Sequence, residues 1–160
     1  YGIKTQSIMG IVQALNLPPA PLKIEKRKGE LYVWCIVRKK FLVLTPEEWV
    51  RQHFIHYLIA VVKIPIERIA SEYGITVNNL TRRCDVVVFD KSGKAKMIVE
   101  CKATTVEVNQ SVFFQIAQYN RQLNVDFLVL TNGLTHLFAR INRETNQLEM
   151  LNEIQKEWLM

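Results

Sequence analysis

Two apolar segments joined by a short polar turn constrain the fold of this chain most. "RRCDVVVFD" (82–90) and "MIVECKA" (97–103) are β-branched runs separated by Ser92-Gly93, which predicts an antiparallel hairpin. A helical segment, "QSVFFQIAQYNRQL", follows and leads to a further apolar strand, "DFLVLTNG". This order predicts a βαβ crossover that places "DFLVLTNG" parallel to "MIVECKA". We therefore expect an α/β (α+β) fold with a mixed sheet flanked by helices.

The segment before this hairpin predicts the clearest helix of the chain. In "TPEEWVRQHFIHYLIAVV", Thr45 is suited to the N-cap, Pro46 to the first helical position and Glu48 to the capping box. Apolar residues follow at helical spacing until Pro65 ends the pattern. This helix is expected to precede three strands, a second helix and two more strands.

The two ends of the chain are expected to add smaller elements to one domain over residues 21–160. Residues 1–20, which include "NLPPAP", are expected to form an extended lead-in. Residues 22–44 predict a basic strand hairpin with its turn at Lys28-Gly29 and a second turn near Arg38–Lys40. Beyond a core at 45–141, residues 147–159 are expected to form a terminal helix.

The positive charge of the chain is concentrated near its N-terminus. Of the net charge of +6, residues 1–40 hold eight Lys or Arg against two Glu, and the remaining residues are neutral in sum. Such a basic segment suits a phosphate-facing edge, and it equally suits an edge hairpin that lysines protect from aggregation. The charge alone leaves both interpretations open.

Composition places the chain in the cytoplasm, away from membranes. With 160 residues, 49% of them hydrophobic and 22% charged, it can build a core without disulfides. Its three cysteines, Cys35, Cys84 and Cys101, lack CxxC spacing and are expected to be free thiols in a reducing compartment. No apolar run has the length that a bilayer requires.

The chemistry is expected at the end of the "MIVECKA" strand. Glu100 and Lys102 are two residues apart and share a face, while Val99 and Cys101 point into the core. The hairpin brings Asp85 to the same end. Two carboxylates and a lysine on apolar strands are costly to bury unless they are paired or bind a metal. Mg²⁺ suits the site, since it needs only one or two protein carboxylates and substrate phosphate.

These residues resemble a known signature. Asp85 followed across a hairpin by Glu100-Cys101-Lys102 resembles the PD-(D/E)XK nuclease motif, and Gln115 and Tyr119 in "QIAQY" resemble the QxxxY motif of one branch. The run over about residues 40–141 resembles the N-terminal nuclease domain of type I restriction enzyme R subunits. Cys84 stands where the motif has a proline, and the chain has no GxxxxGK[ST] loop of an ATPase motor.

The resemblance implies a restriction-endonuclease-like αβββαβ core with an extra N-terminal β-hairpin. It implies a DNA endonuclease that uses Mg²⁺, with Mn²⁺ able to substitute. Asp85 and Glu100 would bind the metal with Glu48 from the first helix, and Lys102 would position the attacking water. Gln115 and Tyr119 would brace Lys102 and contact substrate phosphate. The implied partners are double-stranded DNA and the specificity or modification subunits of a restriction system.

Other interpretations of the same residues stay open at this point. Glu100 and Lys102 can be a surface ion pair, Glu48 can serve only the capping box, and Glu72 can be a further acid of the site or a solvated residue. Cys84 and Cys101 are expected in the core, on the face opposite the acids. The chain can also be a catalytically silent DNA-binding or assembly module, or a nuclease of the repair or resolvase type.

Overall fold

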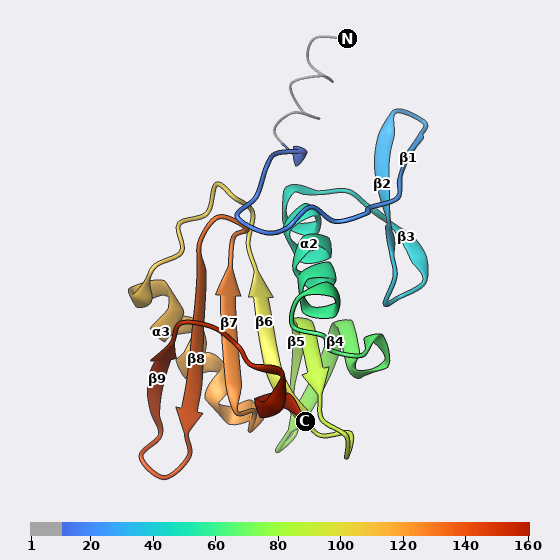
Figure 1. The fold of residues 1–160 in the computed structure, drawn as a ribbon. Helices are drawn as coiled ribbons and strands as arrows, with labels where there is room; N and C mark the ends of the chain where they lie inside the picture. Colours follow the sequence, from blue (N-terminus) through green and yellow to red (C-terminus); the bar gives the residue numbers. More distant parts are fainter. Residues whose placement is uncertain (1–10) are drawn as a thin grey trace.

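The computed structural model describes residues 11–160, except for the side chain of Tyr119, and contains two separate β-sheets. The larger is a six-stranded mixed sheet with helices on its two faces, and the smaller stands beside helix α2 (Figure 1). The six strands, in spatial as well as chain order, are β4 (Ile69–Val77), β5 (Leu80–Phe89), β6 (Ala95–Cys101), β7 (Phe127–Thr131), β8 (His136–Asn142) and β9 (Gln147–Leu151).

The strand pairing confirms the predicted mixed sheet. Strands β6 and β7 pair in parallel and are joined by helix α3 (Gln110–Asn120), and every other neighbouring pair is antiparallel. The β5–β6 turn lies where it was predicted, with Gly93 at a φ of 85°. The register between these strands ends at Val86 opposite Val99, which places the next residues, Asp85 and Glu100, side by side.

Each helix covers one face of the sheet. Helix α2 (Pro46–Ala60) buries Val50, Phe54 and Leu58 in a core with β5 and β6, and α3 buries Phe113 and Ala117 in a second core on the other face. Neither helix, nor any other among the described residues, is long and apolar enough to cross a membrane.

Helix α2 begins as predicted, with Thr45 as its N-cap. The Glu48 side chain, however, has other partners than the predicted capping box would give it. The Thr45 Oγ1 accepts a hydrogen bond from the Glu48 N–H at 3.0 Å, and Pro46 is the first helical residue. The Glu48 carboxylate turns to Arg51 and Gln52, with which it forms hydrogen bonds of 2.7 and 3.1 Å. Glu48 is therefore part of a buried polar cluster as well as of the first turn.

The predicted N-terminal hairpin has both of its predicted turns, and the second turn leads to a third strand. Strands β1 (Ile24–Arg27), β2 (Glu30–Cys35) and β3 (Lys40–Val43) form an antiparallel sheet with turns at Lys28-Gly29 and at Arg38-Lys39. Its inner face packs Val33 with Leu44 and Trp49, so that the small sheet rests on the start of α2.

The lead-in crosses the end of the large sheet. Residues 12–23 form no helix or strand, and the first ten residues of the predicted lead-in lie outside the described part. The Asn16 N–H donates to the Gly133 carbonyl at 2.8 Å, and the Trp49 Nε1 donates to the Gln13 carbonyl at 3.0 Å. We call residues 13–16 the strap.

The predicted terminal helix over 147–159 is wrong. Residues Gln147–Leu151 form strand β9 on the sheet edge, and only Lys156–Leu159 form a 3₁₀ helix. The Asn142 side chain accepts bonds from two turn amides, and Asn146 has a φ of 58°, so that the chain folds back on β8. Leu148 and Leu151 then pack on opposite faces of the sheet, as odd spacing in a strand requires.

Candidate active site

Asp85 and Glu100 meet where strands β5 and β6 stop pairing. The Asp85 Oδ2 accepts a hydrogen bond of 2.8 Å from the Cys101 N–H, which fixes this carboxylate at the end of β6. Glu100 is half-buried, and its Oε1 is shielded from water without a partner among the described residues. Burial and the adjacent Asp85 carboxylate raise the pKa of Glu100 to about 7. The structure therefore joins the two acids that the sequence singled out.

A buried arginine that the sequence analysis missed lies at the centre of this acidic cluster. The Arg51 Nη2 lies 3.0 Å from Asp85 Oδ1 and 3.1 Å from oxygens of both Glu47 and Glu72. Its Nη1 lies 2.7 Å from Glu48 Oε1. Burial alone would lower the pKa of Arg51, but the surrounding carboxylates outweigh this effect, and the pKa is raised above its ordinary value. The guanidinium is the local counter-ion for four acids.

The sequence carried a signal for Arg51. It is three residues before Phe54 and seven before Leu58, so that it lies on the apolar face of α2. An arginine in such a position needs buried acidic partners, because an unpaired charge there is too costly. The glutamates one turn earlier, at i−4 and i−3, supply two of them.

The other acids of the cluster have different surroundings. Glu48, the predicted third metal ligand, is 6% exposed. Its Oε1 accepts a hydrogen bond from Arg51 and its Oε2 accepts one from Gln52. Glu47 is half-buried, and burial together with Asp85 raises its pKa. Glu72 proves to be an acid of this cluster: it pairs with Arg51 and accepts a 2.8 Å bond from Arg83 Nε.

Lys102 follows the end of β6, on the same side as Glu100. Its backbone N–H donates to the Thr131 carbonyl at 2.8 Å, so that the neighbouring strand β7 holds its position. The side chain is half-buried. Its positive charge opposes the rise of the pKa of both Glu47 and Glu100. The role of Lys102 in the site stays a prediction.

Gln115, one of the two helix residues of the predicted site, lies on a different surface from the acids. Gln115 is exposed on α3 and lines a groove of about 420 Å³ with Leu80, Gln118 and Gln122. Asp85, Glu100 and Lys102 do not line this groove. Tyr119 lies on the same helix, and its side chain is outside the described part of the structure.

The two cysteines are buried as expected, but they pack on opposite faces of the sheet. Cys101 joins the core under α2, and Cys84 joins the core under α3. The expectation that both lie opposite the acids assumed an unbroken strand. Glu72 has a φ of 54°, and the β4–β5 pairing skips Glu72 and Asp85, which breaks the alternation. Burial raises the pKa of Cys84 to about 12, so that neither buried thiol is suited to act as a nucleophile.

The pair Asp85 and Glu100 fits a hard divalent cation. No group of three or more His, Cys, Asp or Glu in the described residues is arranged to hold a metal ion. Mg²⁺, however, keeps several waters and takes only one or two protein carboxylates. A cation beside Glu100 would give its shielded Oε1 a partner, and its positive charge would oppose the rise in the pKa of Glu100 that burial and Asp85 cause. Two carboxylates of this kind would suit Mg²⁺, and the metal stays a prediction.

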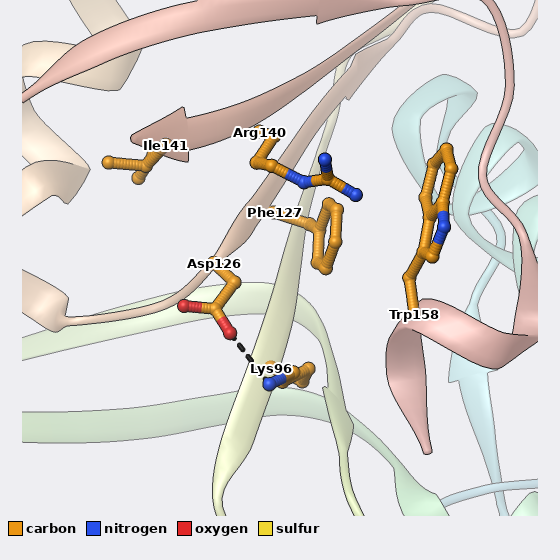
Figure 2. Close-up of a pocket in the computed structure, with 6 residues that line it drawn as sticks. All are labelled: Lys96, Asp126, Phe127, Arg140, Ile141 and Trp158. Carbon is orange, nitrogen blue, oxygen red and sulfur yellow. Dashed lines mark ion pairs between the residues drawn. The ribbon is translucent and has the colours of Figure 1, made fainter. Parts of the chain in front are cut away.

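A second pocket lies near the C-terminus, away from this cluster, and its polar groups are already paired (Figure 2). The Lys96 Nζ lies 2.7 Å from Asp126 Oδ2, and the rings of Phe127 and Trp158 stack with centroids 5.7 Å apart. The Arg140 guanidinium lies 4.8 Å from the centre of the Trp158 ring. These contacts fasten the terminal 3₁₀ helix to the sheet.

The fold and the site together define an α/β domain with an acidic cluster and a lysine at the end of a central hairpin. Residues 46–154, more than half of the chain, match the family described as "Type I restriction enzyme R protein N terminus (HSDR_N)". The chain belongs to this family, which confirms the resemblance found in the sequence.

One solved structure is also similar. It is a fragment of an HsdR subunit of a type I restriction enzyme from Vibrio vulnificus YJ016, and it shares 19% identity with this chain at a TM-score of 0.40. The similarity covers 57% of this chain and 19% of that one. A search of curated proteins gave no match.

Proposed function

We propose that this chain is a Mg²⁺-dependent DNA endonuclease domain of the PD-(D/E)XK type, hydrolysing phosphodiester bonds. The observation that carries the proposal is the half-buried Glu100, whose shielded Oε1 lacks a partner beside Asp85 and near Lys102. An acid with a raised pKa next to a second acid and a lysine is typical of a catalytic site. Membership of the R-protein family supports the same reaction class.

In this proposal each residue has a distinct task. Asp85 and Glu100 would hold Mg²⁺, or Mn²⁺ in its place, and Glu48 would join them only after releasing Arg51. The bound ion would supply positive charge to stabilise the phosphorane-like transition state. Lys102 would orient the attacking water and neutralise developing charge on the phosphate. Gln115, exposed on α3, and Tyr119 would contact substrate phosphates.

The proposed substrate is double-stranded DNA in the cytoplasm. Sequence specificity would come from specificity or modification subunits of a restriction system, as the family assignment suggests. The basic N-terminal sheet would add sequence-independent, salt-sensitive contacts to phosphates. A nuclease of the repair or resolvase type would use the same residues, and cleavage of linear, branched and modified DNA distinguishes these substrates.

One observation favours a second candidate, a catalytically silent DNA-binding or assembly module. The Arg51 Nη2 lies 3.0 Å from Asp85 Oδ1, so that one oxygen of a proposed metal ligand already has a cationic partner. A domain in which Arg51 kept this position would bind DNA without cleaving it.

A plasmid nicking assay with Mg²⁺ or Mn²⁺ separates the two candidates. The wild type should nick supercoiled DNA, while Glu100→Ala and Lys102→Ala should not. Glu107→Ala and Lys91→Ala, at exposed positions elsewhere, are matched controls that should nick normally. Equal nicking by all five proteins would show that contamination causes the cleavage. DNA binding by a wild type that cleaves nothing would support the silent module.

A further inference from the structure

The outer face of the three-stranded sheet is formed by aromatic rings. The register pairs Trp34 with Phe41, and Tyr32 is two residues from Trp34 on the same strand, so that all three side chains share one face. The opposite face carries Val33, which is fully buried against α2. None of the three rings belongs to a buried hydrophobic cluster of the described residues, and each is partly exposed. The rings therefore form a surface rather than a core.

Two cations lie over these rings. The Lys23 Nζ is 5.4 Å from the centre of the Phe41 ring and 6.0 Å from that of Trp34. The Arg27 guanidinium is 4.5 Å from the Phe41 ring and 5.4 Å from the Tyr32 ring. Flat rings alternating with cations can hold both the bases and the phosphates of a nucleic acid strand.

The charge of the sheet suits a polyanion. Residues 22–44 contain seven Lys or Arg and two Glu. Glu25 pairs with Arg27 at 2.8 Å and Glu30 accepts a bond from the Tyr32 hydroxyl, so that both acids are engaged within the sheet. Exposed lysines remain at both ends of the sheet: Lys26, Lys28, Lys39 and Lys40. Figure 1 shows that the β1–β2 hairpin projects away from the large sheet, which leaves room for a ligand.

We propose that this face, made of Lys23, Arg27, Tyr32, Trp34 and Phe41, binds single-stranded DNA. Aromatic side chains stack on bases only when the bases are unpaired, because a duplex hides their faces. The contacts need no particular base, since every base has a face to stack on. The matched family region begins at residue 46, so this surface lies outside what the chain shares with the family.

The position of the sheet gives this surface a route to the acidic cluster. Ile36 and Val37, in the turn between β2 and β3, pack on the core under α2. The charge of Arg38, in the same turn, helps to lower the pKa of Glu72, so that this end of the sheet reaches the edge of the cluster. A strand bound to the rings would thus leave the sheet near the proposed active site. This route rests on the proposed nuclease function, whereas strand binding does not.

The competing explanation is that the rings only stabilise the sheet, since cross-strand aromatic pairs contribute to stability. Trp34 and Phe41 do form such a pair, with centroids 5.1 Å apart. That explanation predicts a loss of stability on ring removal and no change in nucleic acid binding. Binding must therefore be measured on proteins whose folding is verified.

The test measures fluorescence anisotropy of a labelled oligo(dT) strand with the full chain in EDTA, so that no cleavage occurs. We expect Trp34→Ala and Phe41→Ala each to weaken binding roughly tenfold, the usual effect of losing one stacking residue. Trp34→Phe should retain most of the affinity, because it keeps a ring. The double variant Lys23→Ala/Arg27→Ala should bind with a weaker salt dependence. The plot of log K against log salt concentration should become less steep by about 1.4.

Matched controls and competing ligands decide the outcome. Phe114→Ala removes an exposed ring on α3 and Lys91→Ala removes an exposed charge in the β5–β6 turn, and neither should change strand binding. Removal of a ring should weaken the binding of oligo(dT) and leave the binding of duplex DNA nearly unchanged, and oligo(rU) should bind no more tightly than oligo(dT). An equal loss of duplex binding, tighter binding of RNA, or ring variants that fold by circular dichroism and bind oligo(dT) like the wild type, would overturn the proposal. Because EDTA is present, a failure here is independent of any failure to nick plasmid.

Discussion

Arg51 and Asp85 form an ion pair of 3.0 Å that joins helix α2 to strand β5 of the large sheet. The Arg51 side chain is 7% exposed and that of Asp85 is 16% exposed. In the absence of a metal, the guanidinium therefore supplies the positive charge that this group of acids requires. The pair couples the stability of the domain to the electrostatics of its candidate active site.

Removal of Arg51 should destabilise the domain strongly. Arg51→Gln leaves the carboxylates of the buried Glu48 and of Asp85 without their cationic partner, whereas Glu72 keeps Arg83. We expect the free energy of unfolding at neutral pH to fall by about 3–5 kcal/mol, as for other buried pairs that lose one partner. Urea denaturation in EDTA measures this change. Arg83→Gln, at a side chain 65% exposed, is the matched control and should cost at most about 1 kcal/mol. Equal losses in the two variants would contradict the central role of Arg51.

Divalent metal should stabilise the wild type through Asp85 and Glu100. At a Mg²⁺ or Mn²⁺ concentration about 100 times its Kd, linkage adds about 2.7 kcal/mol to the free energy of unfolding. Thermal melts with added metal and then with excess EDTA measure the gain and its reversal. Asp85→Asn and Glu100→Gln should lose the gain, and Glu107→Gln, at an exposed position, should keep it. A full gain in Glu100→Gln would exclude this carboxylate as a ligand.

The raised pKa of Glu100 should make the metal-free protein less stable at alkaline pH. Because the folded-state pKa, about 7, lies above the ordinary value of 4.5, the folded protein holds this proton more tightly than the unfolded chain. The contribution of the Glu100 proton to the free energy of unfolding is complete below pH 4.5, the ordinary pKa of the group. It is lost as the pH rises through about 7. Glu100→Gln cannot ionise, so its stability relative to the wild type should increase between about pH 5 and about pH 8. Urea denaturation measures the free energy of unfolding of both proteins. A difference between Glu100→Gln and the wild type that stays the same at every pH would contradict the raised pKa of Glu100.

Lys102 should be needed for cleavage and dispensable for metal binding. Lys102→Met removes a positive charge near the reacting phosphate, and we expect nicking to slow by roughly 10²–10³-fold, as when one electrostatic contact to a transition state is lost. The metal-induced rise in melting temperature should persist. Lys91→Met serves as the control for loss of a lysine. If Lys102→Met abolished metal stabilisation as well, Lys102 would have a structural role in the site.

The sequence allowed much of this fold to be predicted, because its signals are local and periodic. The alternation in "MIVECKA" placed Glu100 and Lys102 on one face, and the turn at Gly93 brought Asp85 to the same end. Thr45 and Pro46 marked the start of α2 correctly. The matched region confirms the family resemblance, and the structure shows the mixed sheet that the sequence predicted.

The errors arose where tertiary contacts decide the structure. Residues 147–151 have no strong local preference, and pairing with the edge of β8 makes them a strand. Cys84 changes face because Glu72 has a positive φ, which strand alternation cannot reveal. Arg51 was overlooked because an arginine on a helix is usually solvated, and two of its four acidic partners, Glu72 and Asp85, come from strands distant in sequence.

The strap has a consequence for where an independently folding unit begins. A Cβ on Gly133, whose φ is 85°, would lie 2.8 Å from a methyl carbon of Leu15, so that the two residues are in tight contact. Leu15 also packs on the core under α2, and the Gln13 carbonyl accepts the bond of the Trp49 indole. A fragment trimmed to the matched region would expose these apolar surfaces to water. We therefore expect a fragment that starts at the strap to be more stable than one that starts at residue 46, the first residue of the family match.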